Sequence, residues 1–386
     1  MTRAFSNYRV LDFSTTIAGP HCARMLADLG ADVIKIEPPG GEMMRIRPPV
    51  RNGASAMYGQ LNAGKKSVVL DLKDEAGSTA IKRLIADADI IVENFRPGVM
   101  KRFGLDYAAI ADINPKLIYC SISGYGQDGP ASDQPAYAPV VHATSGFDLT
   151  HTSYQPDRDR PDYCGIFVAD VLTGTYAFGA IATALEQRHK TGQGQHIDAS
   201  MLESMLSLPL AEMQAAQFEM PPKPKRPIFG TIETSDGFLN LAVASERTFE
   251  GMATAANRKD WLTDPRFQEY IERRVNWGEL MDEFEAWSAT VTSEECLRIL
   301  TENNVPVAAY RTVREAMSDP QLAHRKAFAT VEDSAGTFKA LNLPFRMTGT
   351  EASVGPRVAT VGEHTRSVLS EAGMSDAEIA AAIGGA

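Results

Sequence analysis

Hydrophobic residues in the first 125 positions alternate between short runs of strand type and longer runs with helical spacing. Apolar residues of helical spacing begin after Gly19-Pro20 and end at Gly30, as in a helix with proline in its first turn. Strands alternating with helices predict an α/β domain with a mostly parallel sheet and helices on both faces. The strand-like runs lie at residues 10–13, 33–36, 67–70, 90–92 and 117–122.

The longest apolar stretch follows Asp170, and the next charged residue after it is Glu186. We expect one long helix that begins near Asp170 and closes at Gly192. A carboxylate at a helix start is favoured by the free backbone N–H groups, so Asp170 should be ionised at pH 7. The stretch 164–185 is long enough to span a membrane, but it carries polar residues and equally fits a buried or subunit-interface helix.

The second half of the chain has a different pattern. Residues 126–164 resemble a loop with short structured pieces, 195–198 a strand, and 202–218 an apolar helix. The proline-rich stretch 221–227 predicts a linker, which places a large domain at 1–220 and a small one at 225–330.

The small domain should be α+β. Two strand-like runs flank Ser235–Gly237 as in a hairpin, and a further short strand is expected at 305–310. Thr292 and Glu295 have the spacing of a capping box at a helix start.

Composition excludes several classes of function. The 386 residues carry a formal net charge of −11, which disfavours binding to nucleic acid or to an anionic membrane. The four cysteines are far apart and form no metal motif, which suits a reducing cytoplasm. The first ten residues lack the apolar core of a signal peptide, so we expect a cytoplasmic protein without a bound metal.

The turn after the first strand, Ser14 to Pro20, lacks the GxGxxG pattern of a dinucleotide site. Pro20 also removes a backbone amide that a phosphate needs. An NAD enzyme is therefore disfavoured, although Glu37 ends the second strand where a ribose-binding acid would lie.

Cations and an aromatic residue follow the strands of this sheet. Lys73 lies after one strand, and Asn94, Phe95 and Arg96 lie directly after another, with Arg102 soon afterwards. Ligands bind at the carboxyl ends of parallel strands, where such residues can hold phosphates and stack on a base. The competing interpretation is an ordinary solvated surface.

In order along the chain, these features resemble the family III CoA-transferases, also called the CaiB/BaiF family. The resemblance spans nearly the whole chain, and its specificity comes from the ordered set of motifs. The matching motifs are Val10–Asp12, Ala18–Pro20, Leu29–Glu37, Lys65–Ser67, Leu70–Lys73, Glu93–Gly98, Asn114-Pro115, Ser123–Gly126, Asp170–Asp198 and Gly362–Thr365.

The resemblance implies an enzyme that moves CoA from an acyl-CoA to a carboxylic acid, with CoA as substrate and no tightly bound cofactor. Its nucleophile matches Asp170, which would form an aspartyl anhydride and then an aspartyl-CoA thioester. It also implies a Rossmann-like large domain, to which residues 335–386 return, and an interlocked homodimer. The family's CoA-contact positions match Ala18, Leu72, Lys73, Asn94, Phe95, Arg96, Arg102 and Tyr137.

Two alternatives stay open. A 2-methylacyl-CoA racemase of the same superfamily pairs the aspartate with a histidine, whose place Tyr137 takes here; His142 lies five residues further on. A phenol with a pKa near ~10 is a poor partner for proton exchange at neutral pH. A CoA-binding protein without turnover is the second alternative.

The resemblance leaves the acyl group open. Ile17 replaces a glutamine of the oxalate enzymes and argues against oxalate. A dicarboxylate such as succinate would find candidate ligands in Arg226 or Arg247. Pro38 replaces a CoA-binding arginine, a role open to Arg45 or Arg47.

Overall fold

The computed structural model describes residues 3–155, 158, 160–219 and 229–384. By its internal contacts the chain divides into two compact units. The larger contains residues 1–148, 163–210 and 320–386, and the smaller contains 149–162 and 211–319. Residues 320–334 thus lie in the larger unit, whereas the sequence placed the return to it at 335. The predicted linker, 221–227, lies outside the described residues.

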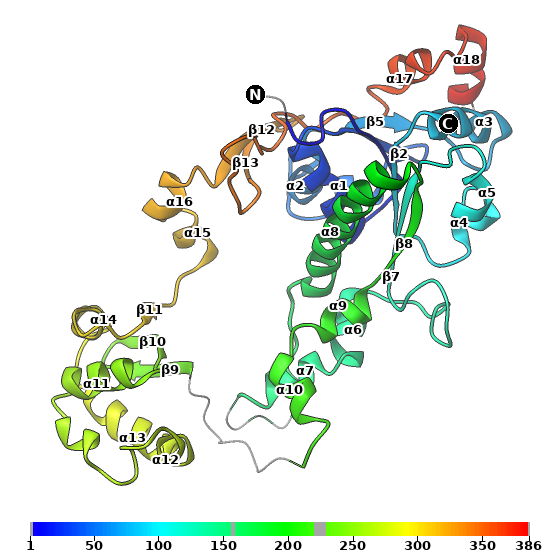
Figure 1. Cartoon of the computed structure of the whole chain (residues 1–386). Helices are drawn as coiled ribbons and strands as arrows, with labels where there is room; N and C mark the ends of the chain where they lie inside the picture. The colour runs from blue at the N-terminus through cyan, green and yellow to red at the C-terminus, as the bar shows by residue number, and fades with distance from the viewer. Residues whose placement is uncertain (1–2, 156–157, 159, 220–228, 385–386) are drawn as a thin grey trace. The chain divides into compact units, whose positions relative to one another are not determined.

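A six-stranded parallel sheet forms the centre of the larger unit (Figure 1). Its order, β5-β2-β1-β6-β7-β8, confirms the predicted α/β class and is the Rossmann order. From β1 the chain first builds the sheet outward on one side and then, at β6, on the other. The strands are β1 (Arg9–Asp12), β2 (Asp32–Glu37), β5 (Lys66–Val69), β6 (Ile90–Glu93), β7 (Ile118–Ser123) and β8 (Gln195–Ser200).

Alternate strand residues fill two cores, one on each face of the sheet. Val10 and Val33 face α1 (Ala18–Asp28) and α8 (Val168–Thr191). Leu11 and Ile34 face the opposite core, which includes α3. The C-terminal helices α17 and α18 complete that second core and lie beside α3 and β5, so the end of the chain returns to the larger unit (Figure 1). These helices are α3 (Glu75–Ala86), α17 (Thr365–Glu371) and α18 (Asp376–Gly384).

The long helix α8 forms where the sequence predicts it. Gly192 closes it in the left-handed region, at φ 75°, with its N–H bonded to the Arg188 carbonyl. By length and composition α8 would suffice to cross a membrane, a test that buried core helices also pass. One side of α8 packs on the sheet, whereas Val171 and Tyr176 lie exposed on another.

The single helix predicted over residues 202–218 is wrong. The structure has two short helices, α9 (Met201–Leu206) and α10 (Leu210–Ala215), with Pro209 between them. Proline lacks a backbone N–H and its ring clashes with the preceding turn, so the helix cannot continue through it.

Smaller elements complete the larger unit. The hairpin of β12 and β13 packs with α2 to form a separate small core. Short helices also precede and follow residues 126–137 in the chain. These elements are β12 (Phe328–Asp333), β13 (Gly336–Leu341), α2 (Ala56–Asn62), η1 (Met43–Ile46), β3 (Val50–Arg51), β4 (Ala54–Ser55), α4 (Val99–Arg102), α5 (Tyr107–Ile110), α6 (Ala138–Thr144) and α16 (Pro320–His324). The helix α7 (Phe147–Thr152) begins in the larger unit, and its residues from 149 on belong to the smaller one.

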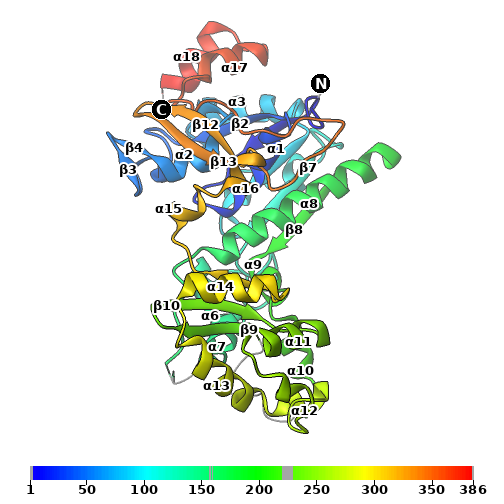
Figure 2. The ribbon, with the colours of Figure 1, turned by 90° about the vertical axis from the view of Figure 1, so that its left-hand side faces the viewer.

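The smaller unit is α+β (Figure 2). The predicted hairpin forms as β9 (Phe229–Thr234) and β10 (Gly237–Ala242), and β11 (Val307–Ala309) joins β10 antiparallel. Its core contains Trp261, Trp277 and other buried aromatic residues. The helices are α11 (Glu246–Ala255), η2 (Lys259–Leu262), α12 (Tyr270–Val275), α13 (Trp277–Ser288), α14 (Ser293–Glu302) and α15 (Val313–Ala316).

Only half of the capping box predicted at Thr292 forms. The Thr292 side chain accepts the Glu295 N–H, but the Glu295 carboxylate pairs with Arg298 instead of reaching back to Thr292.

Candidate active site

The reversal of strand order between β1 and β6 places the loops that follow these two parallel strands side by side at the carboxyl edge of the sheet. The Asn94 side chain joins them: its oxygen accepts the Thr15 N–H at 2.7 Å and its nitrogen donates to the Thr15 carbonyl at 2.8 Å. In open α/β sheets this crevice is where ligands bind. Asn94, predicted to contact CoA, thus also fixes the loop that leads to Ala18.

The loop after β1 has an unusual backbone at Thr16, whose φ of 68° is uncommon for a residue with a side chain. The Thr16 N–H donates to Glu42 Oε1 at 2.7 Å, and Lys35 Nζ lies 2.9 Å from the other oxygen of Glu42. Lys35 also donates to the Ser14 carbonyl at 2.7 Å. A strained conformation persists where its surroundings over-determine it, so this loop is pre-shaped before any ligand arrives.

Buried charges support the loop from below. Lys65 Nζ lies 2.7 Å from Asp12 Oδ2, and both side chains are inaccessible to solvent. Burial alone would raise the pKa of Asp12, but the charges of Lys65 and Lys35 outweigh it and lower that pKa. Lys65 also donates to the Pro20 carbonyl at 2.9 Å and so ties the start of α1 to the same network.

Asp170 lies in the first turn of α8, as predicted, and its side chain is partly buried. Burial raises the pKa of Asp170 to about 6, although hydrogen bonds from the backbone N–H groups of Ala18 and Asp170 oppose the rise. Within the part of the chain that the structure describes, no cation pairs with it. With a pKa near 6, about nine in ten Asp170 carboxylates are ionised at pH 7.

Close packing of α8 on α1 brings Asp170 to Ala18. Gly174, one turn after Asp170, faces the Ala18 carbonyl: a side-chain carbon on Gly174 would lie 2.5 Å from that oxygen and 3.1 Å from the His21 ring. Glycine therefore permits an approach that any other residue would obstruct. The nucleophile predicted from the sequence and the buried start of α1 meet at the switch point of the sheet.

The other predicted contact positions lie at different places in the larger unit. Phe95 and Arg96 follow Asn94 beside the switch point; Arg96 is exposed, whereas Phe95 is half-buried against the hydrophobic core. Leu72 and Lys73 follow β5, which is separated from β1 by β2, hence by about 10 Å. Arg102 ends α4 and is exposed, and Tyr137, 68% exposed, precedes α6.

A hollow of about 280 Å³ opens beside the Asn94 loop, between the ends of β6 and β7. Arg96 and Lys101 line it, together with Glu93 and His196, which the sequence did not single out. Burial raises the pKa of Glu93 to about 7, and its carboxylate accepts the Phe95 N–H at 2.9 Å. Both residues fall within the matching motifs, but neither was predicted to be a site residue, because they come together only through the strand order.

Two residues considered as ligand contacts have structural roles instead. Glu37 is buried, and Arg45 donates to both of its carboxylate oxygens at 2.6 and 2.7 Å. Ser67 also donates to Glu37, and the Arg45 guanidinium lies over the Tyr58 ring. Glu37 is thus no ribose ligand, and Arg45 does not replace the arginine whose position Pro38 occupies.

The remaining candidate arginines are Arg47, Arg226 and Arg247. Arg47 donates to the Met43 sulfur. Arg247 is exposed in the smaller unit, and Arg226 lies outside the described residues.

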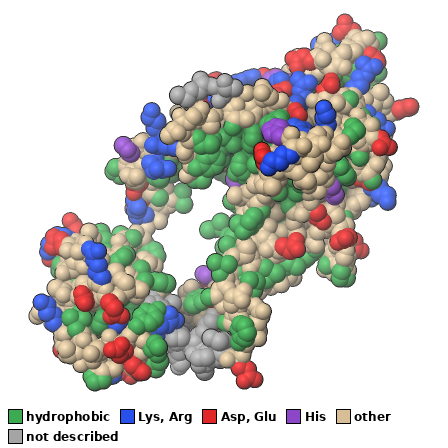
Figure 3. Space-filling view, viewed as in Figure 1, with side chains coloured by type: hydrophobic (Ala, Val, Ile, Leu, Met, Phe, Trp, Pro, Cys, Tyr) green, Lys and Arg blue, Asp and Glu red, His purple; other side chains and the backbone are tan. Residues whose placement is uncertain are grey.

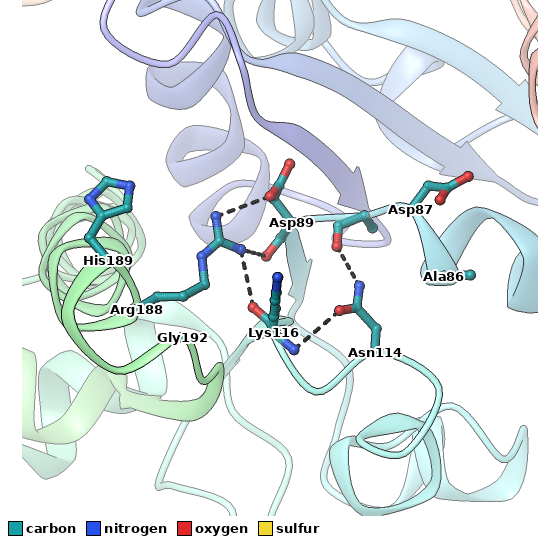
Figure 4. Close-up of a pocket in the computed structure, with 9 residues that line it drawn as sticks. Ala86, Asp87, Asp89, Asn114, Lys116, Arg188, His189 and Gly192 are labelled. Atoms are coloured by element: carbon teal, nitrogen blue, oxygen red, sulfur yellow. Dashed lines mark hydrogen bonds and ion pairs between the residues drawn. The ribbon is translucent and has the colours of Figure 1, made fainter.

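A wider hollow of about 460 Å³ lies at the opposite, amino edge of the sheet (Figure 4). There Arg188 points to Asp89, with an ion pair of 3.0 Å, and also donates to the carbonyls of Asp89 and Lys116. Arg188 follows Asp170 by 18 positions in α8, so the two lie about 27 Å apart along the helix. Arg188 is thus already bonded to protein groups, and this hollow is remote from Asp170.

Comparison with known proteins decides the family. The sequence model of CoA-transferase family III matches residues 5–365. The chain belongs to CoA-transferase family III. It is therefore a CoA-transferase.

Curated relatives agree with this assignment. The chain is 33% identical to the succinate–glutarate CoA-transferase of Agrobacterium fabrum, over 95% of each protein. It is also 33% identical to the succinyl-CoA:mesaconate CoA-transferase of Haloarcula hispanica, over 96% of this chain and 97% of that one.

Solved structures agree as well. A CaiB/BaiF family protein from Brucella suis matches with a TM-score of 0.82 and 29% identity, over 96% of this chain and all of that one. Rv3272 from Mycobacterium tuberculosis matches with a TM-score of 0.83 and 28% identity, over 94% and 98%.

Proposed function

We propose that the enzyme transfers CoA between two carboxylic acids through a covalent bond to Asp170. The observation that carries this proposal is a partly buried carboxylate beside the start of α1, ionised at pH 7 and without a cationic partner among the described residues. A carboxylate in a salt bridge is a weaker nucleophile, whereas this one keeps its lone pairs available.

The chemical steps follow from that nucleophile. An Asp170 oxygen attacks the thioester carbonyl and expels CoA thiolate, which leaves a mixed anhydride. The thiolate then attacks the aspartyl carbonyl and releases the first acid, which leaves an aspartyl-CoA thioester. The second acid attacks that thioester to form a new anhydride, and the thiolate finally takes the acyl group and frees Asp170. The donors that we propose for the oxyanion of each step are backbone N–H groups at the starts of α1 and α8, where those of Ala18 and Asp170 already face the carboxylate.

The loops at the carboxyl edge of the sheet form the CoA site in this proposal. Arg96 and Lys73 are exposed cations that suit the phosphates of CoA, and Ala18 supplies backbone beside Asp170. Tyr137 offers an exposed aromatic ring. Asn94 acts through the loop that it holds as well as through any direct contact.

The substrates we propose are succinyl-CoA and a second small dicarboxylic acid. The support is the naming of relatives that span nearly all of this chain, which act on succinate with glutarate or on succinyl-CoA with mesaconate. Oxalate is the rival acid, because a formyl-CoA:oxalate CoA-transferase of Escherichia coli is 30% identical over 99% of this chain. Ile17 replaces a glutamine of the oxalate enzymes, which argues against oxalate, and its apolar side chain is buried.

We also propose a homodimer that covers the apolar side of the larger unit. Hydrophobic side chains gather on the surface over α8 and α9 (Figure 3), among them Val171, Tyr176, Leu206 and Leu208. A patch of this kind on one chain marks a surface that a partner buries. Burial at a subunit interface is also what the sequence led us to expect for the apolar helix that follows Asp170.

A racemase is the weaker alternative. Tyr137, at the position of the racemase histidine, is exposed, and a phenol is a poor partner for proton exchange at neutral pH. His142, the nearest histidine in sequence, is buried and its Nε2 already accepts the Ala169 N–H. The phenol of Tyr137 and the occupied ring nitrogen of His142 are therefore both poor candidates for the proton exchange of a racemase.

Trapping of the covalent intermediate tests the proposal. The protein is incubated with succinyl-CoA, acetyl-CoA or oxalyl-CoA, treated with hydroxylamine, and digested for mass spectrometry. We expect a hydroxamate on the peptide that contains Asp170, formed fastest with succinyl-CoA. Absence of label with every donor would overturn the covalent mechanism. Exchange of the α-proton of 2-methylacyl-CoA in deuterated water, without an acceptor acid, would instead support the racemase.

A further inference from the structure

His142 contacts the start of the helix that carries Asp170. It lies in α6, is only 1% exposed, and its Nε2 accepts the Ala169 backbone N–H at 3.1 Å. Ala169 directly precedes Asp170 and is itself fully buried. This histidine has no part in the chemical steps above.

The bond satisfies a donor that α8 cannot satisfy itself. The first N–H groups of a helix have no partner within it, and a side chain at the residue before the helix usually accepts one. Here that residue is Phe167, which has no side-chain acceptor, and the helix has no cap of its own. His142 therefore caps α8 from a neighbouring helix.

The protonation state of His142 follows from the same contact. A ring nitrogen that accepts an N–H carries no proton, so the neutral ring holds its proton on Nδ1. Burial lowers the pKa of His142, and the Asp148 carboxylate opposes this only in part. The imidazole is thus neutral near pH 7 and stays an acceptor.

Apolar packing holds the ring in place. The Phe147 ring lies 5.5 Å from it, centroid to centroid, and α6 shares a hydrophobic cluster with α8 and α9 that includes Val141, Ala169 and Met205. A side chain so enclosed has little freedom to release Ala169.

We propose that His142 is a positioning residue that fixes the first turn of α8 and so aims the Asp170 carboxylate at the acyl carbon. The inference rests on the proposed covalent function of Asp170. Misplacement of a reacting group by about 1 Å can slow a reaction about a hundredfold. The loss of this bond should therefore slow the attack of Asp170 more than it weakens CoA binding.

A pair of amide variants tests the bond itself. His142→Gln places an amide oxygen at about the reach of Nε2, whereas His142→Asn is one methylene shorter and cannot reach Ala169. Val141→Ala is the matched control, because it loosens the same cluster and leaves the bond intact. Each variant is measured for the single-turnover rate of acyl labelling of Asp170, for the Kd of CoA, and for Tm.

We expect His142→Asn to label Asp170 at least about tenfold more slowly than wild type, with the Kd of CoA changed less than about threefold. His142→Gln should label within about threefold of wild type, and so should Val141→Ala despite a lower Tm. The proposal is overturned if the Asn and Gln variants label at equal rates, or if Val141→Ala slows labelling as much as His142→Asn. If wild type itself takes no label, the covalent function fails, independently of His142.

Discussion

Asp12 and Asp170, both in the larger unit, differ in their ion pairing and in the direction in which their pKa values shift. Asp12, at the end of β1, is fully buried and lies 2.7 Å from Lys65, and the charges around it lower its pKa. Asp170, at the start of α8, is partly buried without a cation, and its pKa is raised to about 6. The same side chain is a fixed counter-charge in one place and a candidate nucleophile in the other.

The difference lies in how each carboxylate is stabilised. Asp12 accepts hydrogen bonds from Ser14 and Lys65, so its negative charge is already neutralised and held. Asp170 has backbone N–H groups alone to oppose the cost of burial. A charge that its surroundings stabilise poorly gains more from bond formation, which is what a nucleophile requires.

The largest effect should follow from Asp170→Asn. An amide has no charge and is a poor nucleophile, so CoA transfer should fall about a thousandfold or more. Acyl labelling should vanish while Tm stays at or above the wild-type value. Transfer by the variant at the native rate, measured as exchange of CoA between succinate and a second acid, would contradict the assignment.

Lys65→Met should act on stability instead. It leaves the buried Asp12 carboxylate without its nearest cation, which should lower the free energy of unfolding by about 3–5 kcal/mol. Urea unfolding measures this. The double variant Asp12→Asn/Lys65→Met removes both charges and should recover part of the loss; an equal loss in both variants would show that the pair itself matters little.

The pH dependence of labelling should follow Asp170. Its folded pKa of about 6 lies above the ordinary value of 3.8, so the carboxylate gains a proton as pH falls through 6. The labelling rate should be level above pH 7 and fall about tenfold per unit well below pH 6. Rates between pH 5 and 8, with folding followed by circular dichroism, test this. A labelling rate that stays level down to pH 5 would mean that burial does not govern Asp170.

Arg96→Ala should have the smallest effect. Removal of one exposed cation from the proposed phosphate site should raise the KM for acyl-CoA about tenfold and leave kcat nearly unchanged. Lys82→Ala is the control, since Lys82 is an exposed cation on α3, remote from the switch point. Equal KM values for the two variants would exclude Arg96 from the CoA site.

The periodicity of the sequence determined the strands of the sheet, the helices between them and the position of Asp170 at a helix start. These features depend on local spacing, on Gly192 as a helix end and on the alternation of apolar residues, all of which neighbouring residues decide. Local pattern failed at residues 202–218, where the apolar spacing outweighed Pro209 in the prediction.

Only the tertiary structure decided which charged residues are free to act. Glu37 and Arg45 were candidate ligand contacts, but they form an ion pair with each other. The left-handed backbone of Thr16 depends on a hydrogen bond to Glu42, a residue from another loop. The cap from His142 on α8 and the pKa of Asp170 likewise come from segments remote in sequence or from burial. Pairing and burial are properties of the packed chain, because they depend on which distant residues the strand order brings together.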